Sequence, residues 1–150
     1  MADAQNQAGV AQQIVDKSRA MADFLLRELP AGIRTHRVEV VVVDFGGQQR
    51  DIVFRSPFGE VWGRFGFRLV QQELHGVLEL LKVDRSLDAS ISLVPLHAML
   101  FDRFGNASFD ESNAAGWDWD CEGDIVPEAE AARTFARIMT LKQLDLVRAI

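Results

Sequence analysis

The sequence predicts an α+β domain in which an antiparallel sheet of about four to five strands is packed by three helices. Two stretches, each carrying a glycine-containing turn, alternate in the manner of β-hairpins, and apolar residues recur at helical spacing in three other segments. The predicted order is helix, hairpin, helix, hairpin, helix. No linker or repeat divides the 150 residues, so a single domain over 1–150 is expected, with residues 1–8 disordered.

The first helix is predicted from about Ala8 to Leu29, because Pro30 and Gly32 stop it. A strand follows in "VEVVVVDF", where Val38, Val40 and Val42 are expected on one face. Gly46 and Gly47 mark the hairpin turn, and residues 50–56 form the returning strand. The connector "SPFGEVWGRFGF" has room for a third short strand around Val61.

A second helix is predicted over Phe67–Val83. Gly76 lies inside it at a cost of about 1 kcal/mol relative to alanine, which indicates close packing at that position. The apolar stripe of this helix consists of Phe67, Val70, Leu74, Val77, Leu78 and Leu81.

The second hairpin is predicted from "ASISLVPLHAMLFD", a turn at "DRFGN" and a short strand at "ASFDE". Pro95 lacks an amide donor, so an edge position or a bulge is expected there. Pro127, Glu128 and Glu130 suit the start of a last helix. Its predicted buried side is Phe135, Ile138, Met139 and Leu141.

The net charge of −6 comes from one segment. Between Phe104 and Ala132 there are eight carboxylates and no Lys, Arg or His, whereas the rest of the chain carries 14 acids and 16 bases. A nucleic-acid binder needs a basic face, so that class is disfavoured, and a basic partner is favoured. The carboxylates are Asp110, Glu111, Asp118, Asp120, Glu122, Asp124, Glu128 and Glu130.

Several features indicate a cytoplasmic protein that has no membrane contact. The single cysteine, Cys121, excludes an internal disulfide, and the N-terminus lacks the basic and apolar regions of a signal peptide. The longest apolar runs are too short to span a bilayer.

Catalytic signals are weak. The sequence has no nucleophile elbow, phosphate-binding loop or dinucleotide fingerprint, and His36, His75 and His97 lack metal-ligand spacing. His97 alternates with apolar residues, which favours a hydrogen-bonded core or interface histidine. We therefore expect neither an enzyme nor a cofactor.

The segment "DWDCEGDI" has part of the pattern of a calcium-binding loop. Asp118, Asp120 and Glu122 fit its positions 1, 3 and 5, but Ala129 stands where the bidentate Glu belongs, so no metal is expected. A disordered tail is disfavoured by Trp117 and Trp119. Whether these two tryptophans pack inward or anchor a partner stays open.

The stretches "FLLRELPAGIRTHRVEVVVVDFGG", "LVQQELHGVLELL" and "LVPLHAMLFDRFGNASFDES" together resemble the YezG-like family of bacterial immunity (antitoxin) proteins. The resemblance covers about residues 20–120 and is most specific at the second hairpin. There a strand ends at Asp102, the turn carries Gly105, and Phe109 and Asp110 follow. The family often has Tyr beyond this hairpin, whereas this chain has none, and its last helix begins after an additional "CEGDIV".

The resemblance implies a cytoplasmic protein that binds and blocks a secreted toxin, commonly a nuclease-type effector. We expect an acidic surface to cover the basic cleft of that toxin, which would be of nuclease or deaminase type, and we leave monomer and homodimer open. The second hypothesis is a type III secretion chaperone, an acidic dimer whose usual order has three strands between its first two helices. The predicted contacts are Asp110, Glu111, Trp117, Asp118, Trp119, Asp120, Glu122 and Asp124.

Overall fold

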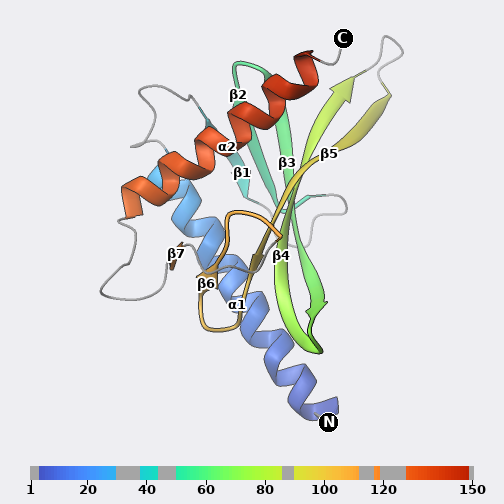
Figure 1. The fold of residues 1–150 in the computed structure, drawn as a ribbon, viewed down its shortest axis with the longest axis vertical. Coiled ribbons are helices and arrows are strands. Elements are labelled where there is room, and N and C mark those ends of the chain that lie inside the picture. Colours follow the sequence, from blue (N-terminus) through green and yellow to red (C-terminus); the bar gives the residue numbers. More distant parts are fainter. Residues whose placement is uncertain are drawn as a thin grey trace.

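The computed structural model describes residues 4–29, 38–43, 50–85, 90–111, 117–118 and 128–148. Within these ranges two helices, α1 (Ala4–Glu28) and α2 (Glu128–Arg148), pack on one antiparallel sheet (Figure 1). The α+β class is therefore confirmed. The strands lie in the sheet in chain order and are β1 (Glu39–Val43), β2 (Ile52–Ser56), β3 (Gly59–Val70), β4 (Glu73–Arg85), β5 (Ile91–Phe101), β6 (Asn106–Ala107) and β7 (Trp117–Asp118).

The predicted helix over Phe67–Val83 is wrong, and the order helix, hairpin, helix, hairpin, helix fails with it. This stretch is the end of β3, a two-residue turn, and most of β4, with Val70 paired to Glu73. Gln71 and Gln72 form the turn with φ of 50° and 69°. Glutamine is not a turn signal, and apolar residues on both sides of β4 remove the period-two alternation that identifies a half-buried strand.

The first hairpin is confirmed in β1 and β2, although its turn at Gly46 and Gly47 lies outside the described residues. The register shifts within β1, where Val40 pairs with Phe54 and Val42 with Val53, so the predicted alternation does not run through the strand. The strand expected around Val61 is present as β3 and has 12 residues. Helix α1 begins at Ala4, ahead of the predicted start.

The predicted irregularity at Pro95 is a bulge. Leu80 pairs with His97 and Leu81 with Pro95, so Leu96 is the extra residue on β5. The bulge reverses which side chains face the helices. After it, Met99 and Phe101 point into the main core, whereas Leu93 before it packs on the opposite side.

Both helices contribute to the main core, in which the rings of Phe54 on β2 and Phe135 on α2 lie 5.4 Å apart. The buried stripe of α2 continues to Gln143, whose side-chain oxygen accepts a hydrogen bond from Ser56 Oγ at 2.7 Å. Leu141 was predicted on this stripe but is 46% exposed. The core includes Ile14, Met21, Phe24, Leu25, Ile52, Phe54, Val61, Leu78, Leu80, Met99, Phe101, Phe135 and Met139.

Gly76 provides the close packing expected of it, in a strand rather than a helix. A Cβ atom added there would lie 2.2 Å from the ring of Phe101 on the neighbouring strand. A second, smaller cluster of Val53, Trp62 and Val83 packs with Leu93 on the other face of the sheet. Neither described helix is long and apolar enough to cross a membrane.

Candidate functional site

The predicted contact segment begins at the end of the sheet. Asp110 and Glu111 follow β6, and Trp117 and Asp118 form β7, pairing with Ala107 and Asn106. β7 is the last strand in the sheet order among the described residues. Trp119, Asp120, Glu122 and Asp124 lie outside the described residues, as do the side chains of Trp117 and Asp118.

The backbone holds Asp110 beside β5. The carbonyl oxygen of Asp110 accepts a hydrogen bond from the amide of Leu100 at 3.2 Å and another from the hydroxyl of Ser108. The amide of Ser108 in turn donates to the Leu100 carbonyl at 2.9 Å. These bonds fix where the acidic segment leaves the sheet, and the side chains of Asp110 and Glu111 are exposed.

Glu111 is already paired within the protein. Its Oε1 lies 3.2 Å from Nη1 of Arg68 on β3, and 59% of the Glu111 side chain is exposed. An ion pair with this exposure contributes about 0–1 kcal/mol, so a partner could exchange it at little cost. The sequence prediction missed Arg68 because that residue was assigned to a helix. The period-two alternation in "RFGFRLV" was the available signal.

Asp110 and Glu111 line an open cleft of about 630 Å³. Arg64 and Glu79 form a cross-strand ion pair in it at 3.3 Å, and the Lys142 side chain reaches it from α2. Its polar lining is Arg64, Arg68, Lys142, Glu79, Asp110, Glu111 and His97. Three cations and three carboxylates balance, so this cleft selects neither anions nor cations by net charge.

His97 is half-buried beside this cleft, and its Nε2 lies within hydrogen-bonding distance of the Phe109 carbonyl oxygen. A neutral imidazole that bonds a carbonyl through Nε2 must carry its proton on that nitrogen. This contact is the hydrogen-bonded structural role that the alternating pattern around His97 predicted, and it ties β5 to the start of the acidic segment.

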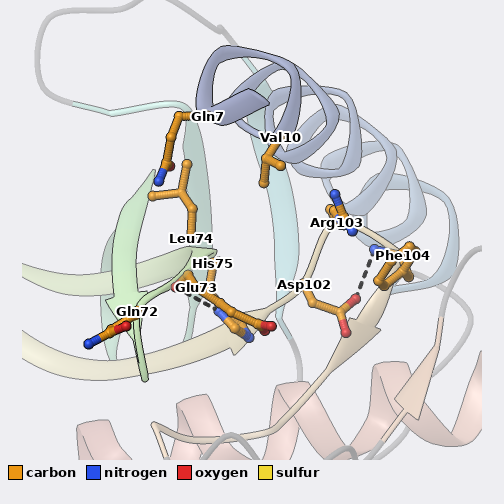
Figure 2. Close-up of a pocket in the computed structure, with 9 residues that line it drawn as sticks. All are labelled: Gln7, Val10, Gln72, Glu73, Leu74, His75, Asp102, Arg103 and Phe104. Carbon is orange, nitrogen blue, oxygen red and sulfur yellow. Dashed lines mark hydrogen bonds between the residues drawn. The ribbon is translucent and has the colours of Figure 1, made fainter. Parts of the chain in front are cut away.

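A smaller pocket of about 240 Å³ lies where the N-terminal end of α1 meets two turns of the sheet (Figure 2). Figure 2 shows Gln7 and Val10 of α1 on one side, with Glu73 and His75 of β4 opposite. The Nδ1 atom of His75 lies 3.3 Å from the Glu73 carbonyl oxygen. The volume of this pocket is below the roughly 300–1,000 Å³ of typical small-ligand sites, so the pocket is a poor candidate for binding a substrate.

Asp102 shapes one wall of that pocket. Its Oδ1 accepts hydrogen bonds from the amides of Phe104 at 2.9 Å and Asn106 at 3.0 Å, closing the turn between β5 and β6. Gly105 in the same turn has φ of 94°, a conformation that favours glycine. The carboxylate is therefore used by the turn, as its position in "DRFGN" predicts.

Among the residues that the structure describes, no three His, Cys, Asp or Glu side chains gather as metal ligands would. One described group has a perturbed pKa: burial lowers the pKa of Lys82 below its usual 10.5, while Asp84 and Glu60 raise it less. Its Nζ donates a hydrogen bond to the Phe58 carbonyl. Lys82 lies on β4, and its ammonium group reaches the turn between β2 and β3.

No family model, curated protein or solved structure matches this chain.

Proposed function

We propose that this chain is an immunity protein that binds and neutralises a basic protein toxin of nuclease or deaminase type. One observation carries the proposal: the net negative charge of the chain comes entirely from the segment between Phe104 and Ala132, which has eight carboxylates and no Lys, Arg or His, whereas the rest of the chain carries 14 acids and 16 bases. The segment starts at the β6–β7 end of the sheet, where it is attached to a folded edge. This attachment supports a contact surface whose described part, residues 104–111 and 117–118, is held by the sheet.

Inhibition then follows from charge and occlusion. Enzymes that act on nucleic acids hold phosphates with Lys and Arg, and carboxylates placed on those side chains neutralise them and exclude the substrate. Long-range attraction steers the toxin toward the segment, and Trp117 and Trp119 supply anchor area at its centre. The inhibitor acts stoichiometrically and needs no catalytic group.

An ion pair within the protein sets Glu111 apart from the other proposed contacts. Glu111 is held by Arg68, so its charge is partly neutralised before any partner arrives. Asp118 lies on the outermost described strand, with Asp120 two residues further along. We therefore assign most of the binding energy to Asp118 and Asp120 and less to Glu111.

The probe is a toxin encoded next to this chain in the native host, recognised as a large secreted protein with a toxin-like C-terminal domain. Calorimetry measures the binding of that protein to this chain. We expect Asp118→Lys with Asp120→Lys to weaken binding about 100-fold or more, as for desolvated charge contacts. The control, Asp23→Lys with Asp145→Lys, changes the net charge equally on exposed helix positions. Equal losses for the two variants would contradict the assignment.

A secretion chaperone is the second candidate, and β3 favours it, because the chaperone order has a third strand after the first hairpin. The chaperone order expects a helix after that strand, but residues 64–85 form the end of β3, a turn and β4, so that helix is absent from them. The two functions differ in their ligand. An immunity protein binds the folded toxin domain, whereas a chaperone binds an extended segment of a secreted protein. Measuring the affinity of this chain for the folded domain and for an unfolded peptide therefore distinguishes the two functions.

A further inference from the structure

Strand β3 is longer than its neighbour β2, and part of its edge has no partner strand among the described residues. The β2–β3 pairing ends at Ile52 and Gly63, and from residue 64 to residue 70 β3 pairs only with β4 among the described residues. Figure 1 shows the far end of this β3–β4 hairpin projecting beside the N-terminal half of α1. An open strand edge presents unpaired amides and carbonyls that another strand can bond.

The two hairpin turns show which backbone groups point outward. The turn Gln71–Gln72 makes Val70 and Glu73 a hydrogen-bonded pair, so even-numbered residues of β3 bond to β4. The turn between Ser56 and Gly59 makes the odd-numbered residues bond to β2. Beyond the end of β2, the odd-numbered residues therefore direct their amide and carbonyl groups away from the sheet.

Phe67 and Leu69 are the odd-numbered residues beyond β2 whose backbone groups have no partner within the described part of the chain. The amide of Phe65, the first in the series, donates to Asp51 Oδ2 at 2.8 Å and is occupied. The side chains of Phe67 and Leu69 are 51% and 67% exposed, so apolar surface and bonding groups coincide. Natural open edges usually carry charged side chains, proline or a bulge. The charges on this stretch, Arg64 and Arg68, are paired with Glu79 and Glu111, and Phe67 and Leu69 themselves offer no such protection.

A shallow groove of about 130 Å³ runs along this edge. Ile14 and Val15 of α1 line one side, and Phe65, Gly66 and Phe67 of β3 line the other. Side chains alternate along a strand, so a strand bonded to the edge would direct every second side chain toward α1. The groove supplies apolar contacts for those side chains.

We propose that a second copy of the chain occupies this edge, with β3 pairing antiparallel to β3 about a two-fold axis at Phe67. Outward-facing residues must bond to outward-facing residues. A register centred on Phe65 would set Phe67 against Gly63, which already pairs with β2, and one centred on Leu69 would set Phe67 against Gln71 of the turn, so three registers remain. If Phe65 faces Phe67 of the other copy, Arg64 opposes Arg68; if Phe67 faces Leu69, Arg68 opposes itself. Like charges directly opposite each other destabilise a strand pair.

Only the register with Phe67 opposite Phe67 avoids both conflicts. It sets Arg68 against Gly66 and Arg64 against Val70, and it sets Phe65 against Leu69, apolar against apolar. The same patch then serves both copies, as an isologous interface requires. This self-complementarity favours a second copy over an unrelated strand, and it depends on neither proposed function.

Cysteine cross-linking tests the register in a Cys121→Ser background. Hydrogen-bonded antiparallel residues have Cα atoms about 5.5 Å apart, within disulfide range, so Phe67→Cys is expected to cross-link to itself under mild oxidation. Leu69→Cys is the matched control on the same edge. Its two copies would stand four residues apart, about 13 Å along the strands, and are expected not to cross-link. Cross-linking at Leu69 but not at Phe67 would overturn the register.

Light scattering tests the dimer itself. We expect the measured mass to rise from 16.8 kDa toward twice that value between micromolar and millimolar protein. Phe67→Lys places like charges opposite each other and is expected to keep the chain monomeric with an unchanged circular dichroism spectrum. Phe104→Lys changes the charge equally at an exposed aromatic outside the edge and is expected to leave the mass increase intact. A wild-type chain that stays monomeric throughout would overturn the proposal.

Discussion

At the scale of single residues, Gly76 and Gly66 make a matched pair. A Cβ at Gly76 would lie 2.2 Å from the Phe101 ring, whereas one at Gly66 would meet Val77 at 3.7 Å, an ordinary contact. We expect Gly76→Ala to lower the free energy of unfolding by about 1–3 kcal/mol, since a packed ring must move. Gly66→Ala is expected to be neutral or stabilising. Urea unfolding measures both, and equal effects would contradict the packing argument.

Lys82 predicts a pH dependence with a defined sign. Burial lowers its pKa in the folded protein below the usual 10.5, so between those two pKa values the unfolded chain holds a proton that the folded chain has lost. The free energy of unfolding should therefore rise with pH in the interval just below 10.5. The chain has no tyrosine, so tyrosine ionisation does not contribute in this interval. Unfolding titrations of wild type and Lys82→Met test this, since the variant should lose that component of the rise.

At the scale of the elements, the sequence predicted those with clear periodicity and recognisable ends. Helix α1 stops before Pro30, and the alternation of β5 carries a bulge at the residue following Pro95. Strand β4 could not be identified in this way. Val77 and Leu78 are adjacent and both buried, and a strand buried on both faces shares its apolar spacing with a helix.

The β3–β4 turn is the element whose sequence fits its conformation least. Gln71 and Gln72 both have positive φ, which costs a residue with a side chain about 1–2 kcal/mol. We expect Gln71→Asn with Gln72→Gly to raise the free energy of unfolding by about 1–2 kcal/mol, because Asn-Gly favours this turn.

The chain contains a matched control for that change. Gln12 and Gln13 are the same dipeptide on the exposed side of α1, where glycine costs about 1 kcal/mol relative to alanine. Gln12→Asn with Gln13→Gly should therefore destabilise the protein while the turn variant stabilises it. Melting temperatures that move in the same direction for both variants would contradict the assigned turn.

At the scale of the whole molecule, the acidic segment was visible in the sequence and its surroundings were not. Charge counting locates Asp110 and Glu111 without any structure. The contact of Glu111 with Arg68 depends on which face of β3 each side chain takes, and that depends on the register set by the turn at Gln71. A one-residue slip would move Arg68 to the opposite face. The cleft around this contact therefore could not be predicted without knowing the fold.

The same charge separation predicts how association depends on salt. If the chain is the immunity protein proposed above, the eight carboxylates in one segment attract its basic toxin at long range, and salt shortens that range to about 10 Å at 0.1 M. We expect the association rate constant to fall about 10-fold or more from low to high ionic strength while the dissociation rate changes less. Stopped-flow fluorescence of Trp117 and Trp119 can follow the encounter.

Two double variants with equal changes in net charge distinguish long-range steering by the acidic segment from an effect of the total charge. Asp118→Lys with Asp120→Lys should flatten the salt dependence, because both reversed charges lie in the segment proposed to contact the toxin. Asp23→Lys with Asp145→Lys raises the net charge of the whole chain equally and should leave most of the slope, because those carboxylates stand on the helices. An association rate that is independent of ionic strength in the wild type would show that the acidic segment does not guide the partner, and the proposed inhibitory surface would then have to lie elsewhere on the molecule.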